Sequence, residues 1–151
     1  RHIFYFSPFR VLFMGCFAGS VQYSIVTLYL WEVRMYQQFS FNSETRGQIE
    51  ILRLKGYLED TGGTTLKAHV QKCLDAGLSR FALDFSTIEL ISSPGVAALL
   101  DISGMVVDDF AGQIAVWGLD KHHSVVLEMS GLFFMAQQVG SEAEAMSLLS
   151  A

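Results

Sequence analysis

The sequence contains few cysteines and few prolines. Cys16 and Cys73 are the only two cysteines among 151 residues, and there are two prolines. Two thiols so far apart in the chain are too few for a disulfide framework or a metal site, so we expect a reduced, cytoplasmic setting. Because 51% of the residues are hydrophobic, the composition excludes disorder for most of the chain.

The usual catalytic and nucleotide-binding motifs are also missing. Gly62-Gly63 is not followed by the Lys-Ser/Thr of a phosphate-binding loop, and no Gly-x-Gly-x-x-Gly occurs. The carboxylates of Glu59, Asp60 and Asp84 have no evident acid or base partner, and no serine stands at a nucleophile elbow. The sequence therefore predicts a protein that is not an enzyme and that needs no cofactor.

The histidines do not have the spacing of a metal site. His69 falls on a predicted helix beside Lys72, where a solvated side chain is the usual case. His122 and His123 are adjacent, and neighbouring side chains on a helix are expected to point apart. We therefore predict no metal at any of these positions.

Acidic residues dominate the larger part of the chain. Residues 1–34 carry three arginines and one glutamate, whereas residues 35–151 carry 7 basic and 14 acidic groups. A net charge of −7 over residues 35–151 disfavours direct nucleic-acid binding and favours a basic protein partner.

The first 34 residues differ in character from the rest. Residues 11–31 contain no charged side chain, and such a stretch is long enough to cross a membrane. Met35 offers another explanation, because a start at Met35 would make residues 1–34 an upstream or over-extended translation. A signal peptide is the third alternative. We divide the chain into a hydrophobic segment, 1–34, and a single domain, 35–151, with membrane association expected only if 11–31 is a genuine transmembrane helix.

Within residues 35–151, the hydrophobic pattern alternates between strand and helix periods. Two alternating stretches separated by a polar turn predict a hairpin, and Gly62-Gly63 is expected to interrupt the chain before a helix that Gly77 ends. The later elements are a strand leading into a helix, an apolar strand, a short helix, a final strand and a helix capped by Ser141. The fold class is α/β, a mixed sheet of about four or five strands packed against helices; the expected elements lie near residues 39–42, 48–55, 66–77, 81–84, 94–107, 113–119, 121–129, 133–139 and 142–149.

Residues 81–100 are the central stretch, in which the chain changes from strand to helix. Ser93 stands where a helix N-cap is expected, with Pro94 at the first helical position. One interpretation is that Ser93 is only a cap, worth roughly 1 kcal/mol. The other is that Ser93 accepts a phosphate, which the positive end of the helix dipole would tolerate. The residues alone leave both interpretations open.

Three segments resemble the STAS domain family, and in particular the bacterial anti-sigma-factor antagonists. Residues 84–100 resemble the family's Asp-Phe-Ser strand end leading into Asp-Ser-Ser-Gly and a helix. Residues 49–58 resemble its second strand, and residues 127–132 resemble its late helix followed by Gly-Leu. The resemblance extends over residues 36–149 and implies a compact α/β domain.

The resemblance implies a regulatory binding module. In the family, the unmodified domain binds an anti-sigma factor that is also a serine/threonine kinase, and phosphorylation of one serine weakens that complex. Aligned on Gly95, this serine is Ser93, with Ser92 as an alternative acceptor; Ser92 stands where the family has aspartate and Pro94 where it has serine or alanine. The implied partner-binding residues are Glu59, Asp60, Ser92, Ser93, Pro94 and Gly95.

Other members of the family have different roles, and two alternatives remain open at this stage. STAS domains also occur in anion permeases, in lipid-transport complexes and in stressosome scaffolds, so this chain could be an interaction module of such an assembly without a phospho-switch. In the third and simplest interpretation, the module binds a partner and Ser93 is only a cap.

Overall fold

The computed structural model describes residues 36–151, which form a five-stranded mixed sheet in the order β1-β2-β3-β4-β5. β1 pairs with β2 antiparallel, and all later pairs are parallel. The strands are β1 (Ser40–Arg46), β2 (Ile49–Leu58), β3 (Arg80–Ile91), β4 (Gln113–Trp117) and β5 (Gln137–Gln138).

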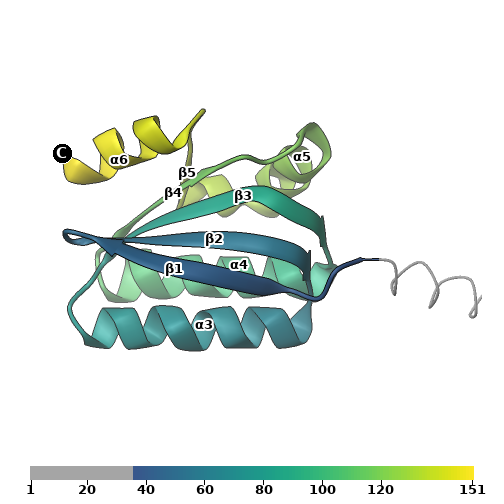
Figure 1. Cartoon of the computed structure of the whole chain (residues 1–151), viewed down its shortest axis with the longest axis horizontal. Helices are drawn as coiled ribbons and strands as arrows, with labels where there is room; N and C mark the ends of the chain where they lie inside the picture. Colours follow the sequence, from purple (N-terminus) through teal and green to yellow (C-terminus); the bar gives the residue numbers. More distant parts are fainter. Residues whose placement is uncertain (1–35) are drawn as a thin grey trace, which may run out of the picture. The chain divides into compact units, whose positions relative to one another are not determined.

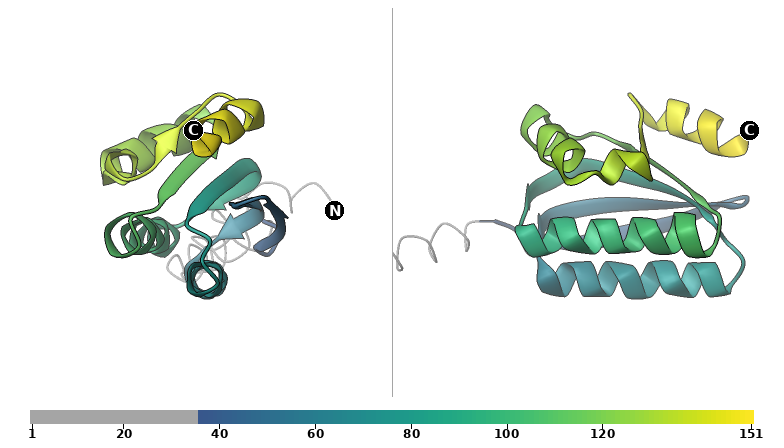
Figure 2. Two further views of the ribbon diagram at one scale, coloured as in Figure 1. Left: turned by 90° about the vertical axis from the view of Figure 1, so that its left-hand side faces the viewer. Right: turned by 180° about the vertical axis from the view of Figure 1, so that it is seen from behind.

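The helices cover both faces of the sheet. α3 and α4 lie side by side on one face, and α6 lies on the other (Figures 1 and 2). The larger core joins the sheet to α3 and α4 through side chains such as Leu54, Leu66 and Leu99, and a smaller core joins it to α6 through Ile51 and Leu149. The helical elements are α3 (Asp60–Asp75), α4 (Ser93–Gly104), the π-helical turn η2 (Met105–Asp109), α5 (Lys121–Ser130), the 3-10 turn η3 (Leu132–Phe134) and α6 (Glu142–Ser150).

The predicted hairpin is confirmed. β1 and β2 pair from Ser40 with Lys55 to Arg46 with Ile49. Gly47 in the turn has φ +65°, a conformation that glycine adopts without steric cost. The prediction that Ser141 caps the last helix is also confirmed, because its side chain accepts a hydrogen bond from the backbone N–H of Glu144.

The prediction that Gly62-Gly63 interrupts the chain is wrong. Both glycines are buried in the first turns of α3, which begins at Asp60. A Cβ on Gly63 would lie 2.4 Å from the Cβ of Ala98 in α4. The glycines therefore allow α3 and α4 to approach closely, a tertiary requirement that outweighs their low helix propensity.

The strand of the central stretch is longer than predicted. β3 continues without interruption to Ile91, and its second half pairs with β2 alone because its pairing with β4 ends at Asp84. The final predicted strand is shorter than expected: residues 132–134 form η3, and β5 contains only Gln137 and Gln138.

Among residues 36–151, no helix combines the length and the apolar character that crossing a membrane requires. The charge-free stretch 11–31 lies outside the described residues. The three interpretations of residues 1–34 therefore stay predictions.

Candidate functional site

The six predicted partner-binding residues lie together at one end of the sheet. β2 and β3 are parallel neighbours, so their carboxyl ends meet at the same edge. α3 follows β2 after Glu59, and α4 follows β3 after Ser92. The backbone N–H of Ser92 donates a hydrogen bond to the carbonyl oxygen of Leu58 at 2.9 Å, which joins the two strand ends directly.

The N-cap of α4 is Ser92, and the prediction that Ser93 is the cap is wrong. The Ser92 hydroxyl accepts a hydrogen bond from the backbone N–H of Gly95 at 3.1 Å and donates one to the carbonyl oxygen of Leu58 at 3.3 Å. Ser93 is the first residue of the helix, its side chain is exposed, and its hydroxyl forms no hydrogen bond with the described residues. The hydroxyl that caps the helix and the exposed hydroxyl therefore belong to two different serines.

This separation predicts different effects on stability. Ser92→Ala should lower the free energy of unfolding by about 1 kcal/mol, because it removes a side-chain cap. Ser93→Ala should change it by less than about 0.5 kcal/mol, because an exposed and unpaired hydroxyl is lost. Urea denaturation of both variants checks the prediction, and an equal loss in the two variants would contradict the assignment of the cap.

Gly95 holds the start of α4 against the end of β2. A Cβ at this position would lie 2.4 Å from the carbonyl oxygen of Leu58 and 3.1 Å from the Ile91 side chain. Gly95 is therefore a packing residue beneath the exposed surface. Its small size lets the start of α4, with Ser93 and Pro94, lie close to the end of β2.

Glu59 and Asp60 mark the start of α3. The Glu59 carboxylate accepts a hydrogen bond from the backbone N–H of Gly62 at 2.7 Å and caps the helix, a role that the sequence analysis missed. Asp60 is exposed, and with Pro94 it lines a groove of about 560 Å³ between α3 and α4. Lys67 and Asp101 form an ion pair within the same groove.

The two helix starts differ in charge. The first turn of α3 carries Asp60 and is capped by Glu59, whereas the first turn of α4 contains no acidic residue. A helix N-terminus has a partial positive charge that stabilises nearby anions. An anionic group on Ser93 would thus be tolerated by α4, while Glu59 and Asp60 keep the surrounding surface acidic.

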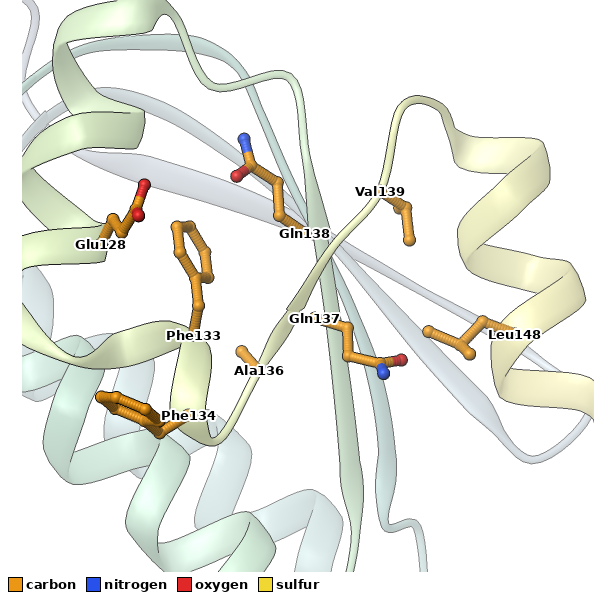
Figure 3. A pocket seen from close by; sticks show the side chains of 8 residues that line it. All are labelled: Glu128, Phe133, Phe134, Ala136, Gln137, Gln138, Val139 and Leu148. Carbon is orange, nitrogen blue, oxygen red and sulfur yellow. The ribbon is translucent and has the colours of Figure 1, made fainter.

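A second depression lies beside the short edge strand β5 (Figure 3). Its volume is about 650 Å³. β5 passes between Phe133 and Leu148. Phe134, which follows Phe133 in the chain, is 94% exposed. The lining is mainly apolar and amide side chains with one carboxylate; the lining residues are Glu128, Phe133, Phe134, Ala136, Gln137, Gln138, Val139 and Leu148.

The structure also corrects the interpretation of the histidines. His69 is partly buried, and its Nε2 lies 3.0 Å from the carboxylate of Glu50 and 3.5 Å from the sulfur of Cys73. His123 is buried with its Nδ1 against Asp120 at 3.1 Å, and its ring contacts that of His122 instead of pointing away from it. The only sequence signal for the first cluster was the four-residue spacing of His69 and Cys73 on one helix face.

Comparisons with known proteins confirm the fold. A structure of the Bacillus cell fate determinant SpoIIAA in its phosphorylated form matches with a TM-score of 0.59 at 20% identity, covering 72% of this chain and 98% of SpoIIAA. An anti-sigma factor antagonist from Mycobacterium paratuberculosis matches with a TM-score of 0.66 at 11% identity, covering 76% of this chain and 96% of the other.

A third match is a much larger protein, the murine solute carrier 26 family member A9 anion transporter. The TM-score is 0.61 at 14% identity, and the match covers 95% of this chain but 28% of the transporter. No protein-family model matches the sequence, and neither does any curated protein. The likeness therefore establishes an α/β fold of the STAS type, resembling that of the anti-sigma factor antagonists.

Proposed function

We propose that this STAS-fold chain is an anti-sigma-factor antagonist, a non-catalytic binding module whose partner is an anti-sigma factor with serine kinase activity. Phosphorylation of Ser93 switches the module off. One observation carries the proposal: Ser93 presents an exposed hydroxyl at a fixed place in the fold. Ser92 before it is hydrogen-bonded to Leu58, and Gly95 after it lies close against the carbonyl oxygen of Leu58. Fold similarity to anti-sigma factor antagonists supports the class of partner.

Ser93 is a better acceptor than Ser92. A kinase must bring the γ-phosphate of ATP in line with a free hydroxyl. The Ser92 hydroxyl is part-buried and engaged in two hydrogen bonds, so modifying it would remove the cap of α4. The Ser93 hydroxyl can be modified without breaking any hydrogen bond within the described residues.

The proposed partner surface includes the start of both helices. Asp60 and Pro94 line the groove between α3 and α4, and Ser93 directly precedes Pro94 in the chain. The net charge of −7 over residues 35–151 favours a partner with a basic surface around this groove.

The proposal is tested by intact-mass spectrometry of the full chain after incubation with ATP and the serine-kinase anti-sigma candidates of the same genome. We expect a gain of one phosphate, mapped to Ser93 and absent from Ser93→Ala. Ser92→Ala is the matched control and should still be modified. Phosphate that persists in Ser93→Ala and disappears in Ser92→Ala would assign the switch to Ser92, and no modification by any candidate would contradict the phospho-switch.

A second candidate function is an interaction module of a membrane transporter. The match to the murine anion transporter favours it, since that match covers nearly the whole chain. The two functions differ in their binding partner. Calorimetry of the full chain with each candidate anti-sigma factor distinguishes them, because an antagonist binds one of these proteins directly and a transporter module binds none.

A further inference from the structure

Three side chains with metal-binding atoms meet between β2 and α3. Glu50 comes from the start of β2, and His69 and Cys73 come from α3. One donor atom from each of the three lies within 4.8 Å of the other two. Glu50 is 3% exposed and Cys73 is 8% exposed, so the cluster is buried in the domain and not part of the solvated surface.

The separations of these atoms are near those of a tetrahedral metal site: the nitrogen–sulfur distance fits, and the nitrogen–oxygen distance is shorter by a few tenths of an ångström. His69 Nε2 lies 3.0 Å from Glu50 Oε2 and 3.5 Å from Cys73 Sγ. With zinc bond lengths of about 2.0–2.3 Å, ligand atoms at tetrahedral angles stand about 3.3–3.6 Å apart. We propose that Glu50, His69 and Cys73 bind a zinc-class divalent cation, with the fourth coordination position left to water.

Neighbouring residues orient two of the three ligands. Thr45, which pairs with Glu50 across the hairpin, donates its hydroxyl to Glu50 Oε1 at 2.5 Å and leaves Oε2 for His69 and the cation. The ring of Phe41 packs edge-on against the His69 imidazole at 5.1 Å between centroids. Such outer contacts fix the orientation of ligands in metal sites.

The charges of the donor set balance those of the cation. A dication bound by one thiolate, one carboxylate and a neutral imidazole forms a site without net charge, which suits a buried position. Binding replaces the thiol proton of Cys73 by the metal and releases that proton to solvent.

The donor types also select the metal. Sulfur and imidazole nitrogen are ligands for zinc and related transition metals, whereas magnesium and calcium prefer sites made of oxygen. The side chain of His69 is 25% exposed, so solvent reaches the cluster at this ligand.

This cluster is separate from the proposed phospho-switch. Glu50 is the second residue of β2 and Leu58, beside Ser92, is the last. At a rise of about 3.3 Å per residue, the two sites stand about 25 Å apart along the strand. The metal would join α3 to the β1–β2 hairpin without contact to the partner groove.

The site is tested by titrating the reduced full chain with Co²⁺, whose visible spectrum reports tetrahedral coordination, followed by displacement with Zn²⁺. We expect one equivalent to bind, with a thiolate-to-cobalt charge-transfer band. Cys73→Ser should remove this band, and His69→Gln should weaken binding by at least about 100-fold. Cys16→Ser, which alters the only other cysteine, and His122→Gln are matched controls and should bind as the unchanged chain does.

Two outcomes would overturn the proposal. One is the absence of a charge-transfer band at millimolar Co²⁺, which would make the cluster an ordinary hydrogen-bonded group. The other is unchanged binding in Cys73→Ser or His69→Gln. Circular dichroism of each variant establishes that it is folded, and Zn²⁺ but not Mg²⁺ should raise the unfolding temperature of the unchanged chain by several degrees.

Discussion

If the proposed complex with an anti-sigma factor forms, Ser93→Asp is expected to weaken it by at least about tenfold. A kinase holds a carboxylate base against the hydroxyl that it phosphorylates, so a negative charge on Ser93 would face that carboxylate within the complex. The repulsion adds to the cost of removing the new charge from water. The adjoining groove offers little compensation, because it contains the acidic Asp60 and its Lys67 is already paired with Asp101.

Calorimetry of the full chain with the anti-sigma factor measures this effect. The matched control is Ser147→Asp, which adds the same charge to an exposed position of α6 on the other face of the sheet (Figure 2). We expect its affinity to remain within about twofold of that of the unchanged chain, because rim or remote charges are screened by salt. Equal weakening in both variants would indicate a general effect of net charge and contradict a local switch at Ser93.

Gly95→Ala is expected to lower the free energy of unfolding by about 2–3 kcal/mol, a large effect for one methyl group. The new Cβ would lie 2.4 Å from the carbonyl oxygen of Leu58. This oxygen belongs to the backbone of the buried strand β2 and already accepts a hydrogen bond from Ser92. The start of α4 would have to move away from β2, so partner binding should fall together with stability.

Gly104→Ala is the matched control in the same helix. A Cβ at Gly104 would meet nothing nearer than the Asp108 carboxylate at 3.9 Å, and the backbone there is helical, with φ −61° and ψ −43°. Alanine should therefore stabilise the protein by up to about 1 kcal/mol through its higher helix propensity. Urea denaturation of both variants gives the comparison, and a stable Gly95→Ala variant would contradict the close contact between α4 and β2.

Much of the fold follows from local pattern. The alternation around Phe39 and Phe41, and again after Ile49, is a property of neighbouring residues, and it predicted the hairpin that β1 and β2 form. Ser141 likewise caps α6 through a contact only three residues away. The six predicted partner-binding residues came from a family resemblance, and the parallel pairing of β2 with β3 brings them to one edge.

Where prediction failed, a distant residue decided the outcome. Gly62 and Gly63 are typical of a break in a helix, yet they lie inside α3 because Phe39 and Ala98 occupy the space that side chains would need. Ser92 and not Ser93 caps α4, since β3 continues to Ile91 and its end is held by Leu58 of the neighbouring strand. Neither contact leaves a signal in the local sequence.

The sequence by itself determined the α/β class, most element positions and the stretch that contains Ser92 and Ser93, because hydrophobic period and capping depend on residues within a few positions of each other. Only the tertiary structure decided which serine hydroxyl is engaged and which is exposed. It also brought Glu50 against His69 and Cys73, about twenty residues further along the chain. Such contacts depend on how a helix packs on a sheet, and that packing is determined by side chains throughout the hydrophobic core.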